Sequence, residues 1–220
     1  MPVNPLAHAR YVASAHDLTQ LPAAAGPEVA FAGRSNAGKS SAINALVGHN
    51  RLAFVSKTPG RTQMINFFAL PRDRFLVDLP GYGYAKVPEK ERARWGEVIS
   101  RYLMERANLV GLVAIMDVRH PLTGLDRQLL DWFLPGGRPV HILLTKADKL
   151  SRQQAAKQLA GVRRELGRGP MTVQLFSSLS RAGLDEAART IESWFSGEGA
   201  PSTQAEKETP GQGEGAGGKP

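Results

Sequence analysis

The sequence has no cysteine and no long apolar run. Zero cysteines in 220 residues exclude a disulfide framework, a thiol nucleophile and cysteine-ligated zinc. No segment approaches the roughly 20 apolar residues that span a bilayer, and the N-terminal residues lack the continuous apolar stretch of a signal peptide. We therefore expect a cytoplasmic protein without a membrane partner, in which any metal is held by oxygen or imidazole.

Acidic residues are fewer than basic ones, and the two signs are unevenly distributed. The formal net charge is +8, but the Gly- and Pro-rich segment 197–220 holds four glutamates against two lysines, so it carries −2 and leaves +10 for the remainder. This tail has no aromatic or large aliphatic residue, which predicts disorder. The basic remainder favours a polyanionic partner, with solubility alone as the alternative.

Short apolar runs alternate with longer amphipathic segments, a pattern typical of an α/β fold with a mostly parallel sheet and helices on both faces. We expect a six-stranded sheet with strands over residues 28–33, 66–70, 75–79, 109–117, 139–145 and 171–176. Helices are expected over 39–47, 89–106, 125–133, 152–166 and 184–195. Trp95, Trp132 and Trp194 are expected to pack in the core.

A phosphate-binding loop is the first functional signal. Residues 33–40, GRSNAGKS, match G-x-x-x-x-G-K-[ST] between an expected strand and an expected helix. Gly33 and Gly38 let the backbone turn so that successive N–H groups face one anion. Lys39 supplies a charge for the β- and γ-phosphates, and the Ser40 hydroxyl is a hard ligand for Mg²⁺. The loop predicts nucleotide binding without distinguishing an ATPase, a small-molecule kinase and a GTPase.

Two later segments narrow that choice. Asp78 begins DLPG at the end of an expected strand, where its carboxylate can hold Mg²⁺ through water. In TKAD, residues 145–148, Asp148 can accept from both N1–H and the 2-amino group of guanine, which adenine cannot offer. Lys146 would lay its stem along the base, and FSS, residues 176–178, would bring a backbone N–H near guanine O6. A helix-capping loop is the alternative for TKAD taken alone.

Six segments together resemble the EngB family, also called YihA or YsxC, of bacterial ribosome-assembly GTPases, in the TrmE-Era-EngA-EngB-septin-like class. They are GRSNAGKS, KTPGRTQMINFF, DLPGYGYA, MDVRHPL, TKADKL and FSSLSRAG, and the resemblance covers about residues 10–196. It implies a P-loop NTPase of the small-GTPase fold, with a G domain over 25–196, an N-terminal extension over 1–24 and the tail over 197–220.

The resemblance also implies an activity and partners. It implies hydrolysis of GTP to GDP and phosphate with Mg²⁺ as cofactor, as a molecular switch in assembly of the large (50S) ribosomal subunit. A requirement for normal cell division and septation would follow. The implied partners are GTP, GDP, the large-subunit precursor, its rRNA and its ribosomal proteins, and we expect a monomer.

Nucleotide contacts are implied residue by residue. The implied contacts are Gly33, Arg34, Ser35, Asn36, Ala37, Gly38, Lys39, Ser40, Gly60, Arg61, Thr62, Gln63, Met64, Asp78, Leu79, Pro80, Gly81, Thr145, Lys146, Ala147, Asp148, Phe176, Ser177 and Ser178. Ser40 and Thr62 are the implied ligands of Mg²⁺, with Thr58 as a competitor for the second place. The implied catalytic group comprises Lys39, Thr62 and Gly81, whose N–H would detect the γ-phosphate; to it we add Asn36.

Three positions differ from the wider GTPase pattern. Thr145 replaces the usual Asn and Ser178 the usual Ala, as in this family. Tyr82 stands where Ras-like enzymes carry the Gln that orients the attacking water, so we expect slow intrinsic hydrolysis. We hypothesise that Asn36 helps to hold a K⁺ ion where an arginine finger would place its charge; stabilisation of the loop turn is the alternative.

Basic side chains could bind rRNA, although a solvated surface is the alternative for each. The candidates are Lys57, Arg61, Lys86, Arg92, Arg94, Arg152, Lys157, Arg163, Arg164 and Arg168. Arg119 and His120 are expected to fix a loop.

Two rival functions stay open. One is a metabolic P-loop kinase, which a measurement of nucleotide preference would distinguish from a GTPase. The other is a scaffold that binds GTP without hydrolysing it, which turnover stimulated by ribosomal particles would exclude.

Overall fold

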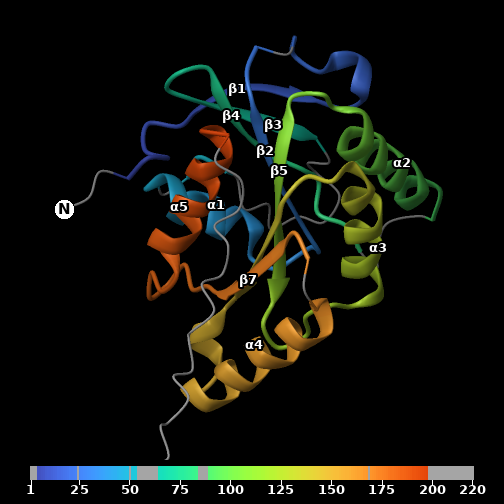
Figure 1. The fold of residues 1–220 in the computed structure, drawn as a ribbon. Coiled ribbons are helices and arrows are strands. Elements are labelled where there is room, and N and C mark those ends of the chain that lie inside the picture. The colour runs from blue at the N-terminus through green and yellow to red at the C-terminus, as the bar shows by residue number, and fades with distance from the viewer. Residues whose placement is uncertain are drawn as a thin grey trace, which may run out of the picture.

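One mixed sheet with helices on both faces forms the fold in the computed structural model, which describes residues 4–23, 25–49, 51–53, 64–83, 89–167 and 169–197 (Figure 1). The strands are β1 (Arg10–Ala15), β2 (Glu28–Gly33), β3 (Ile65–Leu70), β4 (Arg74–Asp78), β5 (Leu109–Asp117), β6 (Val140–Thr145) and β7 (Met171–Leu175). The α-helices are α1 (Lys39–Val47), α2 (Glu89–Glu105), α3 (Gly124–Phe133), α4 (Arg152–Leu166) and α5 (Leu184–Phe195). Each element expected from the sequence is present within one residue of its expected ends.

The strand order is β1-β3-β4-β2-β5-β6-β7. Strands β4, β2, β5, β6 and β7 run parallel, while β3 pairs antiparallel with β4 and β1 antiparallel with β3. Strands β3 and β4 lie on one side of β2, and β5 and the later strands lie on the other side. The side on which successive strands are added therefore reverses at β2. In such sheets ligands bind outside the carboxyl ends of the strands at this point.

The expected count of six strands was wrong, because the segment before residue 25 contributes a seventh. Strand β1 lies at the sheet edge, and Ser14 Oγ donates to Asn66 Oδ1 of β3 at 2.6 Å. Its register shifts between Tyr11 and Ala13, and its first three residues are exposed. An exposed edge strand with a bulge has no continuous apolar run to reveal it.

Two hydrophobic clusters separate the helices into layers. Helices α2 and α3 pack on one face of the sheet, together with buried Val162 of α4, and α1 and α5 pack on the other face (Figure 1). Trp194 is buried in the second cluster, and Trp132 is partly buried against the first, as expected. The side chain of Trp95 lies outside the described residues.

Close packing fixes the position of α5 against the sheet. A Cβ added at Gly111 of β5 would lie 2.2 Å from Trp194 Cε3, so only glycine leaves room for the indole ring. Among the described helices, none is both long enough and apolar enough to cross a membrane.

Candidate nucleotide-binding site

The residues expected to bind nucleotide lie at the carboxyl ends of the parallel strands. Gly33 ends β2, Asp78 ends β4, Asp117 ends β5 and Thr145 ends β6. Since β4, β2, β5 and β6 are neighbours in that order, four segments distant in sequence meet at one edge of the sheet.

The phosphate loop connects β2 to α1 without an intervening element. A Cβ at Gly33 would lie 2.6 Å from the Ile115 carbonyl oxygen, so close approach to β5 requires glycine there. Asn36 and Gly38 both have positive φ, at 64° and 99°, which glycine and asparagine adopt most readily. Gly38 is the N-cap of α1, and the first N–H groups of a helix have no intrahelical acceptor. The loop therefore ends on a helix N-terminus, where an anion is favoured.

Lys39 and Asp78 are in contact at the start of α1. The Lys39 ammonium donates to Asp78 Oδ1, and both side chains are largely buried. Ser40 follows Lys39 in α1, so the residues here supply a hydroxyl as well as a carboxylate, both hard oxygen donors. These donor types fit Mg²⁺ bound together with a nucleotide phosphate, in which Ser40 would be a direct ligand and Asp78 would act through water.

Thr145 joins the end of β6 to the phosphate loop. Its Oγ1 lies 3.0 Å from the Met116 carbonyl oxygen and also within hydrogen-bond reach of the Ala37 carbonyl oxygen. The side chain is buried, so a hydroxyl without these acceptors would be costly. Thr145 thus connects the two loops at the position where most GTPases have asparagine.

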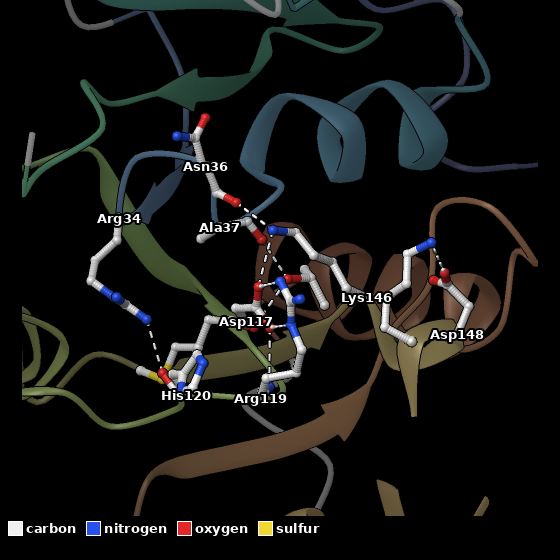
Figure 2. Close-up of polar contacts among 11 residues, drawn as sticks. Arg34, Asn36, Ala37, Asp117, Arg119, His120, Lys146 and Asp148 are labelled. Atoms are coloured by element: carbon white, nitrogen blue, oxygen red, sulfur yellow. Dashed lines mark hydrogen bonds and ion pairs between the residues drawn. The ribbon is translucent and has the colours of Figure 1, made fainter. Parts of the chain in front are cut away.

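Lys146 makes a second connection between the same loops. Its Nζ donates to the Asn36 carbonyl oxygen at 2.6 Å and lies 3.0 Å from Asp117 Oδ2 (Figure 2). Its backbone has φ 59°, a left-handed conformation that turns the chain sharply after β6. Lys146 therefore holds the phosphate loop at the residue expected to contact K⁺.

Asp117 is a site residue that the sequence analysis did not assign. Arg119 donates to it from the backbone N–H at 3.0 Å, from Nε at 2.9 Å and from Nη2 at 2.6 Å. These bonds, and the nearby Lys146, hold the pKa of Asp117 well below its usual range. The sequence signal that could have identified Asp117 was a carboxylate at the end of β5, which is the neighbour of the strand that leads into TKAD. Arg119 fixes this loop, and the His120 carbonyl oxygen accepts from Arg34 Nη2 at 2.8 Å, which agrees with the role expected for that pair (Figure 2).

Asp148 is oriented by the segment after β7. Ser177 Oγ donates to Asp148 Oδ1 at 2.6 Å, and this hydrogen bond is the main cause that lowers the pKa of Asp148. The Ala147 N–H donates to the Phe176 carbonyl oxygen at 3.1 Å. Ser177 and Phe176 are fully buried, whereas Ser178 is partly exposed. The sequence predicted a backbone role for this segment; the structure adds that the Ser177 hydroxyl orients the carboxylate.

The DLPG segment lies directly against the phosphate loop. A Cβ at Gly81 would lie 3.2 Å from Ser35 Oγ. The Ser35 N–H donates to the Tyr82 carbonyl oxygen at 2.8 Å. The family resemblance assigns residues 60–64 to the first switch, a segment that would respond to the γ-phosphate, and of these the structure describes Met64 alone. Gly60, Arg61, Thr62 and Gln63, and the alternative ligand Thr58, lie outside the described residues.

Fold and site together define a class of protein. A phosphate loop on a helix N-terminus, a strand-end carboxylate beside its lysine and a Ser-oriented aspartate at the base position are the features of a P-loop GTPase. A family model described as "50S ribosome-binding GTPase" matches residues 28–146, more than half of the chain.

Comparison with curated proteins narrows the class to a family. Proteins named "Probable GTP-binding protein EngB" match at 62% identity over 86% of this chain and 92% of the relative in Methylobacillus flagellatus. The one from Thiobacillus denitrificans is 66% identical over 79% of this chain and 84% of its own. The one from Neisseria meningitidis is 55% identical over 88% and 94%. The chain belongs to the EngB family of GTP-binding proteins, and it is a GTPase.

Solved structures agree with this fold. The crystal structure of a probable GTP-binding protein engB has a TM-score of 0.64 and 18% identity, covering 77% of this chain and 99% of that one. Era from Aquifex aeolicus bound to GDP and aluminium fluoride has a TM-score of 0.61 and 21% identity, covering 76% and 56%. At these identities the likeness concerns the fold alone.

Proposed function

We propose that this GTPase acts as a switch in assembly of the large ribosomal subunit, and that it binds the subunit precursor through rRNA. The single observation that carries the proposal is the match of its nucleotide-binding core to the family described as ribosome-binding. In this reading it works in the cytoplasm as a monomer, and a requirement in cell division and septation follows from the need for ribosomes.

The proposed cofactor is Mg²⁺, held by Ser40 and, from the first switch, Thr62. It would neutralise charge on the β- and γ-phosphates. Lys39 would pair with the same phosphates, and the Gly81 N–H would detect the γ-phosphate. Omission of Mg²⁺ is expected to weaken GTP binding in the parent protein and to have a smaller effect in Ser40→Ala, measured by titration with a fluorescent GTP analogue.

K⁺ is proposed as an activator through Asn36. Its side chain is exposed, which leaves the amide oxygen able to contact an ion, while its backbone oxygen is already bonded to Lys146. Asn36 has a left-handed backbone conformation, which asparagine adopts readily. This alone could explain why asparagine occupies the position, so stabilisation of the turn is the competing explanation. GTP turnover is expected to be faster in KCl than in NaCl at equal ionic strength; equal turnover would rule the K⁺ role out.

Exposed basic residues on α4 support an RNA partner. Arg152, Lys157, Arg163 and Arg164 are all exposed, and the acidic Glu165 among them is paired with Arg127. Helix α4 therefore presents a net positive surface at the side of the sheet nearest β7 (Figure 1). Arg94 on α2 is exposed as well, whereas Lys57, Arg61, Lys86 and Arg168, and the side chain of Arg92, lie outside the described residues.

The test is co-sedimentation with large-subunit precursor particles over a range of salt concentrations. The double variant Lys157→Glu, Arg164→Glu is expected to bind about tenfold or more weakly at moderate salt, with a shallower salt dependence. The matched control is Arg72→Glu, Arg189→Glu, which makes the same charge change at exposed sites away from α4. Equal loss in both variants, or no loss, would contradict a role for α4 and direct attention to the face formed by the switches.

A further inference from the structure

Tyr82 follows DLPG at the position where Ras-like enzymes carry the water-orienting glutamine, yet its side chain is turned into the protein. Its Oη donates to Asp126 Oδ1 at 3.1 Å, and its ring packs against the core cluster of α2 and α3. Burial, and then the neighbouring Asp126, raise the pKa of Tyr82 well above its ordinary value, so the phenol remains a donor. This side chain is placed to hold a segment rather than to orient water.

Asp126 is fully buried, and its two oxygens have different partners. Oδ2 accepts from the backbone N–H of Thr123 at 2.9 Å and from its Oγ1 at 2.8 Å, which completes the capping box of α3. Oδ1 accepts from Tyr82 and lies 3.4 Å from Arg34 Nε. The cap of α3 uses only Oδ2, so Oδ1 can contact both Arg34 of the phosphate loop and Tyr82, which follows DLPG.

The backbone of Tyr82 is fixed as firmly as its side chain. Residues Tyr82 and Arg34 form a parallel bridge, and the Tyr82 N–H lies 3.3 Å from the Gly33 carbonyl oxygen. Asp78 is fixed at the other end of DLPG by the pairing of β4 with β2. Gly81 therefore lies between two anchored points, directly beside Ser35.

We propose that Tyr82 and Asp126 are positioning residues for GTP hydrolysis. By joining the DLPG segment, the phosphate loop and the start of α3, the Tyr82–Asp126 hydrogen bond holds the Gly81 N–H where the γ-phosphate of GTP must be met. The same bond makes the N-terminus of α3 sensitive to whether that phosphate is present. This inference rests on the role proposed above for Gly81.

A second tyrosine that donates to a buried carboxylate provides a matched control. Tyr102 Oη donates to Glu28 Oε2 at 2.7 Å, both side chains are buried, and burial raises the pKa of Tyr102 as well. This pair lies where β2 begins, at the opposite end of the strand from the phosphate loop. Replacing either tyrosine by phenylalanine removes one hydroxyl from a buried carboxylate and keeps the ring.

The experiment compares Tyr82→Phe, Tyr102→Phe and the parent protein in single-turnover GTP hydrolysis and in titrations with GDP and a non-hydrolysable GTP analogue. Tyr82→Phe is expected to slow hydrolysis about tenfold and to weaken the GTP analogue about fivefold, with GDP affinity within about twofold, because GDP lacks the γ-phosphate. Tyr102→Phe is expected to lose comparable stability to urea while hydrolysis and both affinities stay near the parent values.

Two results would overturn the proposal. If Tyr82→Phe and Tyr102→Phe hydrolyse GTP equally fast and have the same ratio of GTP-analogue affinity to GDP affinity, Tyr82 serves only in packing. Equal weakening of GDP and the GTP analogue in Tyr82→Phe would mean that the bond supports the phosphate loop generally. Gly81→Pro removes the backbone N–H and separates this failure from that of the underlying role: if this variant hydrolyses GTP at the parent rate, the role proposed for the Gly81 N–H is itself wrong.

Discussion

Single buried polar atoms decide how the loops of the site are held together. The Thr145 hydroxyl reaches two carbonyl oxygens, of Met116 and Ala37, that belong to different segments. The Lys146 ammonium makes a parallel connection to the Asn36 carbonyl oxygen. Movement of β6 is thereby coupled to the phosphate loop, so contacts to a base at TKAD and to phosphates at this loop would support each other.

Thr145→Val tests this connection, because valine keeps the shape and removes the hydroxyl. Loss of the hydrogen bond and the unpaired Ala37 carbonyl should lower the free energy of unfolding by about 1–3 kcal/mol and speed GDP release. Urea unfolding and stopped-flow release of a fluorescent GDP measure the two effects. Thr190→Val is the control, since this buried hydroxyl also donates to a backbone carbonyl, that of Glu186 at 3.0 Å, but within α5. Unchanged GDP release in Thr145→Val would contradict the coupling.

His141 predicts a specific pH dependence of stability. It is buried between β6 and β7, with Nδ1 2.6 Å from Thr172 Oγ1 and Nε2 2.8 Å from Gln174 Oε1. Burial lowers the pKa of His141 to about 4, against about 6.5 in an unfolded chain. Between these values the unfolded state binds more protons, so the free energy of unfolding falls as the pH drops, by about 3 kcal/mol in total.

His141→Gln should remove that part of the acid sensitivity. Urea unfolding at pH 7 and pH 4.5 compares the parent with this variant, and with His16→Gln, whose histidine is exposed. We expect the pH difference to shrink in His141→Gln and to persist in His16→Gln. The same pH difference in all three proteins would show that His141 is not its source.

At the scale of helices and strands, glycine marks where elements approach most closely. Gly111→Ala is expected to lower the free energy of unfolding by about 1–3 kcal/mol, because its Cβ would overlap Trp194 of α5. Gly161→Ala, within α4 and with no atom within 4 Å of its added Cβ, is expected to raise stability by up to about 1 kcal/mol. Equilibrium unfolding in urea measures both. A neutral Gly111→Ala would mean that α5 shifts freely on the sheet.

The sequence predicted most elements because their signals are local. A few neighbouring residues are enough to recognise the glycines of a phosphate loop, a buried strand or a capped helix. The structure has these elements within one residue of their expected ends. Strand β1 was missed because its pairing with β3 depends on residues more than 50 positions away, such as Ser14 with Asn66. Asp117 and Asp126 were missed as site residues for a similar reason, because their links to the site depend on distant residues: Lys146 for Asp117, and Tyr82 for Asp126.

At the scale of the whole molecule, the candidate nucleotide-binding residues lie at one edge of the sheet, and a group of exposed basic residues lies on α4. The carboxyl ends of the parallel strands carry the candidate nucleotide-binding residues, and the basic α4 follows directly from the TKAD segment through Ser151. The proposed nucleotide contacts at the phosphate loop and the proposed polyanion contact at α4 thus lie on different elements, and both adjoin the segment between Thr145 and Arg152. This arrangement is suited to a protein whose affinity for a partner depends on the bound nucleotide.

The central claim is that Asp148 reads guanine, and exchange of the base tests it most directly. Asp148→Asn should weaken GDP binding about a hundredfold. The variant should bind xanthosine diphosphate (XDP) better than the parent protein does, because an amide can donate to the 2-oxygen of xanthine while it still accepts from N1–H. Asp185→Asn, the same change at an exposed site in the first turn of α5, is the control and should leave both affinities unchanged. Titration of fluorescent GDP, XDP and ADP gives the answer. A gain in XDP binding confined to Asp148→Asn is the predicted result, and equal GDP affinity in the parent and Asp148→Asn would contradict the account.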